Sequence, residues 1–89
     1  MSSLATDAVP HANQVRCTDE EIVVSLSDGR TLSVPIVWFP RLAGASQAQR
    51  EDYELLGGGE GVHWPQVDED ISVAGLLMGQ RSAELRHSL

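Results

Sequence analysis

The first half of the chain alternates apolar and polar residues in a pattern that predicts a β-hairpin. Two apolar sets recur at every second position: Ile22, Val24 and Leu26, then Leu32, Val34 and Ile36. A two-residue loop at 28–29 would place apolar residues opposite polar ones. A three-residue loop at 27–29 instead pairs Val24 with Leu32 and puts both sets on one face. The sequence therefore predicts the longer loop, a type I turn that ends in a left-handed Gly29.

Two further strands are predicted on either side of the hairpin. Val15 and Cys17 alternate with polar neighbours and predict an N-terminal strand, in an extended segment that begins at Asn13. Residues 61–64 predict a short later strand, which Pro65 ends because proline cannot donate to a strand ladder. These segments extend the hairpin into a small antiparallel sheet.

A first short helix is predicted in the second half of the chain. Ser46 and Gln49 have the spacing of a capping box, which predicts a helix over 47–55. On this helix, Arg50 and Glu54 are spaced to form an i,i+4 ion pair, which contributes only a few tenths of a kcal/mol.

A second short helix is predicted near the end of the chain. Ser72 is its expected N-cap and Gly79 its end. Its apolar face consists of Val73, Leu76 and Leu77. The acidic residues 68–70 precede it, and their negative charge favours the positive end of a helix dipole.

Three consecutive glycines, Gly57, Gly58 and Gly59, are predicted to cap the first helix and form a tight turn. A phosphate-binding loop has the opposite order, because it follows a strand and opens a helix. Glu60 would also repel a phosphate. We therefore interpret these glycines, with Gly29, as structural turn residues, and expect a β-branched residue at Gly58 or Gly59 to destabilise the fold.

Together these elements predict one α+β domain over residues 13–80. Its expected architecture is a small antiparallel sheet, built from the N-terminal strand, the hairpin and the later short strand, with two short helices. Residues 1–12 predict a disordered leader that includes His11. Residues 81–89 predict a polar C-terminal tail.

Composition and charge narrow the classes of function. The 89 residues include 13 acids and six arginines, with no lysine, for a net charge of −7. The arginines are scattered, so autonomous binding to nucleic acid is not expected. No stretch predicts a membrane span or a secretory signal, so the expected location is cytoplasmic. Because a chain this small has a thin core, we expect a homodimer to add stability.

Candidate chemical groups are few. Cys17 is the only cysteine, which excludes an intrachain disulfide and a four-cysteine zinc site. Its place in an alternating strand predicts a buried side chain rather than a nucleophile. His63 beside the acids 68–70 is the best candidate for metal binding or acid–base chemistry. The other histidines, His11 and His87, fall in the predicted tails, so no catalytic residue, metal or cofactor is expected.

The aromatic residues are the best candidates for binding a partner. Trp38, Phe39 and Trp64, with Pro40, would form an exposed recognition patch if they lie at the surface. Tryptophan is equally typical of small cores, and the chain has only four aromatic residues with which to build one. The sequence leaves both roles open.

Three segments resemble a single bacterial family. They are VPIVWFPRL (34–42), LLGGGEGVHWP (55–65) and DEDISVAGLLMG (68–79). With the hairpin, they resemble the bacterial domain of unknown function 2442 over about three quarters of the chain. The resemblance implies a compact α+β domain without an established activity. Some relatives resemble the N-terminal half of helix-turn-helix proteins, and others sit beside another small protein, as toxin–antitoxin pairs do.

The leading hypothesis is a non-enzymatic protein–protein interaction module, an antitoxin-like or regulatory partner of another small bacterial protein. An exposed sheet edge or residues 38–40 would contact that partner. The alternative is an acidic inhibitor that mimics DNA, which requires the acids at 19–21, 51–54 and 68–70 to align along one ridge. A small metal-binding protein or enzyme centred on His63 is the third hypothesis.

Overall fold

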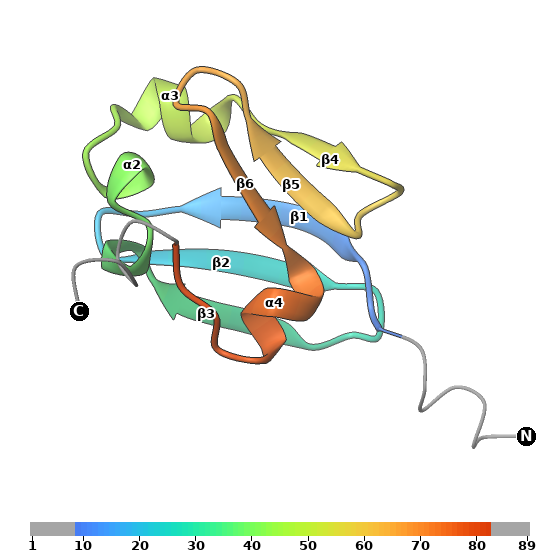
Figure 1. The fold of residues 1–89 in the computed structure, drawn as a ribbon. Coiled ribbons are helices and arrows are strands. Elements are labelled where there is room, and N and C mark those ends of the chain that lie inside the picture. The colour runs from blue at the N-terminus through green and yellow to red at the C-terminus, as the bar shows by residue number, and fades with distance from the viewer. Residues whose placement is uncertain (1–8, 83–89) are drawn as a thin grey trace, which may run out of the picture.

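An antiparallel three-stranded sheet forms the first half of the domain in the computed structural model, which describes residues 9–82 (Figure 1). Its strands are β1 (Ala12–Cys17), β2 (Glu21–Leu26) and β3 (Thr31–Pro35), in the order β1-β2-β3. Proline occupies the last position of β3, an edge strand, where its missing amide proton costs no ladder bond. Both the N-terminal strand and the hairpin are therefore confirmed.

The register of the hairpin is the predicted one. Val24 lies opposite Leu32. The Leu26 amide donates to the Arg30 carbonyl at 2.8 Å, which closes a loop of three residues. Gly29 ends the loop with φ of 95°, a conformation that favours glycine.

Three short helical segments follow β3: η1 (Ile36–Trp38), α2 (Pro40–Ala43) and α3 (Gln47–Glu51). The capping box is confirmed, because the Ser46 hydroxyl accepts from the Gln49 amide and the Gln49 side chain accepts from the Ser46 amide. The helix ends at Glu51, so the predicted span 47–55 is wrong at its C-terminal end. The expected pairing of Arg50 with residue 54 along one helix is wrong for the same reason.

A second antiparallel sheet accounts for this early end. Its strands are β4 (Glu54–Leu56), β5 (Gly61–Trp64) and β6 (Glu69–Ser72), in the order β4-β5-β6. Leu55 pairs with Val62 across β4 and β5. The Tyr53 hydroxyl accepts a hydrogen bond from the Val15 amide at 3.1 Å, which ties the segment to β1. These tertiary contacts outweigh the weak helical preference of so short a segment.

The second sheet also corrects the interpretation of the glycines and the acids. Residues 57–59 lie in the turn between β4 and β5 and do not cap a helix, although all three have the positive φ that only glycine adopts easily. Glu69 and Asp70 precede the last helix as predicted, but they belong to strand β6, which the sequence analysis did not predict. Within β6, Ile71 faces the core while Asp70 and Ser72 are exposed, an alternation too short to signal a strand in the sequence.

The last helix, α4 (Val73–Leu77), begins where it was predicted to begin. The Ser72 hydroxyl accepts a hydrogen bond from the Gly75 amide at 3.1 Å, which confirms the N-cap. Val73 and Leu76 are buried, whereas Leu77 is 37% exposed and only partly joins the apolar face assigned to it.

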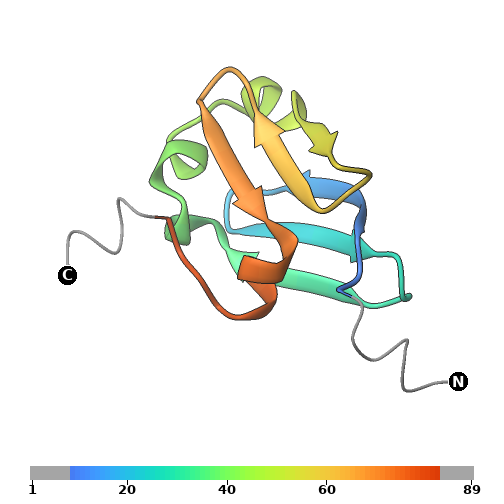
Figure 2. The same ribbon diagram turned by 45° about the vertical axis from the view of Figure 1, so that its right-hand side comes forward.

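The hydrophobic core lies between the two sheets. Figures 1 and 2 show β5 and β6 crossing over the β1-β2-β3 sheet, with α4 at the end of β6. Both sheets and the connecting helices contribute fully buried side chains, which are Ile22, Val24, Ile36, Leu42, Val62, Trp64 and Val73. The α+β class is confirmed, and residues 9–82 form two three-stranded sheets and three short α-helices in place of the predicted one sheet and two helices.

The N-terminal boundary lies earlier than predicted. Ala12 is 2% exposed, belongs to β1 and donates its amide to the Gly59 carbonyl at 2.7 Å. The His11 amide donates to the Ser27 hydroxyl at 2.9 Å. These two residues therefore belong to the domain and not to a disordered leader, while residues 1–8 of that predicted leader lie outside the described residues.

The C-terminal boundary also extends further than predicted. Ser82 is buried, and its amide donates to the Trp38 carbonyl at 3.0 Å. The Arg81 guanidinium stands 4.7 Å from the centre of the Trp38 ring, in cation–π contact. The rest of the predicted tail, 83–89, lies outside the described residues. Between residues 9 and 82, no helix has the length and apolar character needed to cross a membrane.

Candidate functional site

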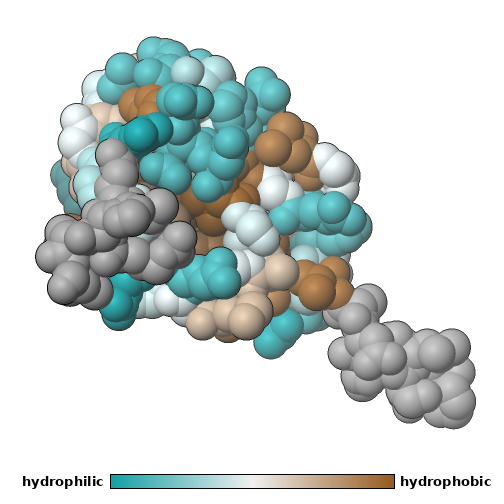
Figure 3. All heavy atoms as spheres, viewed as in Figure 1, coloured by the Kyte–Doolittle hydropathy of each residue, from teal (hydrophilic) through white to brown (hydrophobic). Residues whose placement is uncertain are grey.

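An open groove of about 860 Å³ lies at one end of the second sheet. It is bordered by the N-terminal segment, the β4–β5 turn, strand β6 and the start of α4. Its lining residues are Val9, His11, Leu56, Gly57, Glu60, Gly61, Asp70, Ile71, Ser72 and Ala74. Figure 3 views the molecule from the side on which β5 and β6 lie in front, and apolar surface there alternates with hydrophilic surface.

A missing side chain helps to make this surface concave. Leu56, Gly61 and Ser72 form one row across the three strands of the second sheet. Gly61 contributes no side chain to that row, and a Cβ placed there would lie 3.9 Å from Leu56 and 3.3 Å from the Ile71 carbonyl. Leu56 is 41% exposed beside this gap. The groove therefore has an apolar wall next to bare backbone.

The lining of the groove includes two acidic residues, Glu60 and Asp70. Elsewhere on the domain, some carboxylates contact arginines: Asp28 contacts Arg30 at 2.8 Å, Asp19 contacts Arg50 at 2.8 Å and Asp68 contacts Arg41 at 3.8 Å. Among residues 9–82, no arginine contacts the carboxylate of Glu60 or Asp70, the two acids that line the groove. Negative charge that no arginine offsets among these residues therefore lies beside the apolar wall.

His63 lies next to the groove and contacts one of its acids. His63 and Asp70 are cross-strand neighbours on β5 and β6, and the Nδ1 atom of His63 contacts an Asp70 carboxylate oxygen. This hydrogen bond raises the pKa of His63, and the nearby carboxylates of Glu54 and Asp68 add to the effect, opposed by partial desolvation. The charge of His63, and with it the net charge beside the groove, consequently depends on pH.

His63, the candidate for metal binding or acid–base chemistry, forms a side-chain hydrogen bond with only one of the acids 68–70. Asp70 joins the histidine, but no group of three or more potential ligands gathers within residues 9–82. His11 lines the groove and His87 lies outside the described residues. Cys17 is buried in β1, and desolvation raises the pKa of its thiol to about 11, which disfavours the reactive thiolate.

The contact between His63 and Asp70 predicts a pH dependence of stability. Because folding raises the pKa of His63, the stabilisation is complete below the unfolded value of 6.5 and is lost as pH rises through the folded value. Thermal unfolding of the native chain, measured from below pH 6.5 to above the folded pKa of His63, should show this contribution to Tm decreasing as pH rises. The variant His63→Gln should remove that part of the dependence. An unchanged pH profile in the variant would show that the contact does not contribute.

The aromatic residues named as partner-binding candidates separate into two groups. Trp64 is fully buried and Phe39 is 4% exposed, so both are core side chains and neither belongs to an exposed patch. Trp38 is half-buried against the core beneath Arg81, and Pro40 is the exposed first residue of α2. Only these last two are placed where a partner could contact them.

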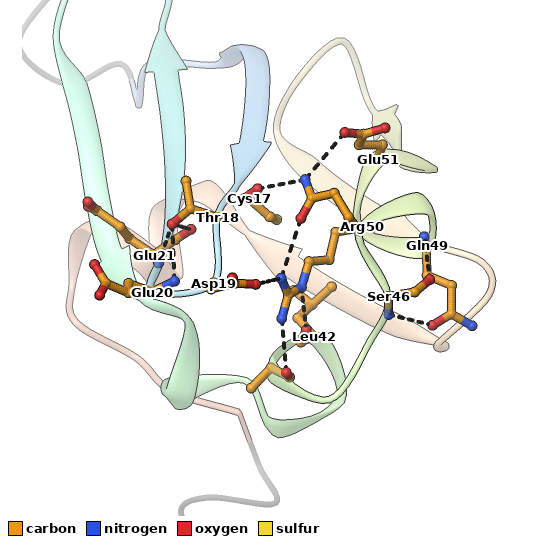
Figure 4. A network of polar contacts seen from close by, with 12 residues as sticks. Cys17, Thr18, Asp19, Glu20, Glu21, Leu42, Ser46, Gln49, Arg50 and Glu51 are labelled. Atoms are coloured by element: carbon orange, nitrogen blue, oxygen red, sulfur yellow. Dashed lines mark hydrogen bonds and ion pairs between the residues drawn. The ribbon is translucent and has the colours of Figure 1, made fainter.

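Trp64 instead belongs to a buried polar network around Arg50, a residue that the sequence analysis assigned to an i,i+4 pair with Glu54. The Trp64 indole donates to the Arg50 carbonyl at 2.9 Å. The Arg50 guanidinium, 6% exposed, donates to the carbonyls of Leu42 and Ala43, each at 3.0 Å, and to Asp19 at 2.8 Å (Figure 4). This network links α3 to the last residues of α2 and to the β1–β2 turn. No local sequence signal distinguishes such an arginine from an exposed one.

Comparison with known proteins places these features in a family. A family model described as a protein of unknown function, DUF2442, matches residues 12–82. The crystal structure of a protein of unknown function from Rhodospirillum rubrum ATCC 11170 is 33% identical, with a TM-score of 0.72, and the match covers 85% of this chain and 94% of that one.

A second solved structure has the same fold. The solution NMR structure of an uncharacterised protein from Chromobacterium violaceum is 27% identical, with a TM-score of 0.74, and the match covers 97% of this chain and 82% of that one. No curated protein matches the chain. These similarities describe a shared fold and assign no activity to it.

Proposed function

Since the chain belongs to the DUF2442 family of proteins of unknown function, we propose that it is a non-enzymatic module that binds a protein partner through the groove on its second sheet. The observation that carries the proposal is the apolar groove between the β4–β5 turn, β6 and α4, with Glu60 and Asp70 in its lining. A groove of this composition can accept an apolar side chain of a partner protein, while polar groups of the partner contact the acidic residues around it.

The energetics of such an insertion are favourable. Burying one large apolar side chain contributes about 1.5–3 kcal/mol, and a few such anchors dominate most protein interfaces. Leu56 offers a contact that is already partly desolvated, because it is 41% exposed beside the gap at Gly61. The groups available for chemistry here are carboxylates, two histidines and the Ser72 hydroxyl. That hydroxyl accepts from the Gly75 amide, and within residues 9–82 no hydrogen bond joins it to a histidine or a carboxylate. Binding therefore has more support than catalysis.

The partner we expect is another small bacterial protein, in a regulatory or antitoxin-like pair. The DNA-mimic alternative has less support, because Asp19 and Asp68, which belong to two of its three acidic segments, contact Arg50 and Arg41. Charges neutralised by arginine do not imitate a row of phosphates.

A selection from displayed peptides would test the proposal. Peptides that cover the proteome of the source organism would be selected on the native domain and on the variant Leu56→Asp. We expect enriched peptides to lose at least about tenfold in affinity with this variant, because a carboxylate replaces the apolar wall. The matched control is Val37→Asp, at an apolar residue that is 64% exposed and does not line the groove.

Two outcomes separate the possibilities. Peptides that bind the Val37→Asp variant normally and the Leu56→Asp variant weakly support the groove as the binding surface. Enriched peptides that bind both variants equally would refute it, provided that both variants melt like the native domain. Circular dichroism melts of each variant supply that control.

A further inference from the structure

We infer that the occupant of the groove is a cationic protein segment, in which an apolar side chain is flanked by arginine or lysine. This inference rests on the proposed function and specifies the chemistry of the partner. The apolar side chain would pack against Leu56, over the gap at Gly61, and the cations would pair with Glu60 and Asp70.

The distribution of charge on the domain supports a cationic occupant. Most of the described arginines lie outside the groove. Arg30, Arg41 and Arg50 contact carboxylates that do not line it, and Arg81 stands over Trp38. The Glu60 carboxylate has no hydrogen-bond or ion-pair partner among residues 9–82. An acid left without a cation beside an apolar wall is complementary to a segment that carries both an apolar and a basic side chain.

His63 adds a pH dependence that distinguishes a cationic occupant from a neutral one. The charged groups around it are Asp70 on β6, Glu54 on β4 and Asp68 in the β5–β6 turn. When His63 is protonated, its charge offsets that of Asp70, and a partner cation is attracted less strongly. When His63 loses its proton, the full charge of Asp70 faces the groove. Binding of a cationic segment should therefore strengthen as pH rises, and binding of a neutral one should not.

NMR titration of the full chain with short synthetic peptides would test the inference. Three peptides share a central leucine in a Gly-Ser background and differ only in its two neighbours, which are arginine, glutamine or glutamate. We expect the arginine peptide to shift the amide signals of Leu56, Gly61 and Ser72, and the glutamate peptide to leave them unchanged. Affinity for the arginine peptide should be several-fold higher near pH 8 than near pH 5.5, and His63→Gln should make this difference smaller.

A charge-reversal pair supplies the matched control. Glu60→Lys should lower the affinity of the domain for the arginine peptide by at least about tenfold. Glu20→Lys makes the same change in net charge at an exposed residue of the β1–β2 turn and should have little effect. If both variants weaken binding equally, the attraction is only a consequence of net charge and the inference is wrong.

The results also separate this inference from the proposed function. If the glutamine peptide shifts the groove signals with the same affinity as the arginine peptide, the occupant is not selected by charge, and groove binding itself still stands. If the arginine peptide shifts signals only outside the groove, or none at all, the cationic occupant is refuted. The proposed function is then decided separately, by the Leu56→Asp selection.

Discussion

Replacing Arg50 by methionine is expected to cost the domain about 3 kcal/mol of its free energy of unfolding. Methionine keeps an apolar stem of similar length and removes every donor of the guanidinium. The carbonyls of Leu42 and Ala43 then lose the donors that reach them at 3.0 Å, and Asp19 loses its ion pair. Against the 5–15 kcal/mol typical of folded domains, this is a severe loss for a small one.

Urea denaturation of the native chain and two further variants would check this expectation. Arg50→Lys keeps the charge without the planar set of donors, and we expect it to lose most of the same stability. Arg16→Met makes the same substitution at an exposed position of β1 and should change stability by less than about 0.5 kcal/mol. Equal effects of Arg50→Met and Arg16→Met would show that the buried network does not stabilise the fold.

Gly59→Ala is expected to destabilise the domain more than Gly58→Ala, although the two glycines are neighbours in one turn. Both have positive φ, 70° at Gly58 and 110° at Gly59, which costs a side chain about 1 kcal/mol or more. Only at Gly59 would a Cβ also meet backbone: it would overlap the Ala12 carbonyl and lie 3.0 Å from the Ala12 nitrogen. No atom lies within 4 Å of a Cβ at Gly58.

The predicted difference is large enough to measure by thermal or urea unfolding. We expect a loss of about 1 kcal/mol for Gly58→Ala and at least about 3 kcal/mol for Gly59→Ala, because the clash would break the bond between the Ala12 amide and the Gly59 carbonyl. Equal losses would mean that the turn moves away from β1 without cost, which would contradict the close approach of the two segments.

The hairpin and the caps could be predicted because local rules determine them. The phase of the apolar residues admits only one register between β2 and β3, and the three-residue loop follows from it. Ser46 and Ser72 cap helices through hydrogen bonds within their own first turns. Each of these features depends on residues within a few positions of one another.

The second sheet could not be predicted because its strands are short and depend on distant partners. β4 has only three residues, Glu54–Leu56, and their sequence continues the helical pattern that begins after Ser46. Its conformation is decided by pairing with β5 and by the Tyr53 hydroxyl on Val15, which lies 38 residues away in the chain. Local propensity is weak enough for such contacts to override it.

The candidate site could be predicted only in part. The sequence identified His63 and the acids 68–70, and the structure brings one of them, Asp70, to the histidine. The groove was missed because it joins segments around residues 9, 57 and 72, which meet only in the fold. The sequence could not decide which aromatic candidates are buried, because their burial also depends on packing between distant segments. Trp64, for example, is buried in the core that the two sheets share.

The measurement that tests the central claim most directly is an NMR structure of the domain with a peptide chosen by the selection described above. Intermolecular NOEs should connect an apolar side chain of the peptide to the methyl groups of Leu56 and Ala74. NOEs that connect the peptide instead to Val37 or Met78, which are exposed apolar residues outside the groove, would contradict the claim.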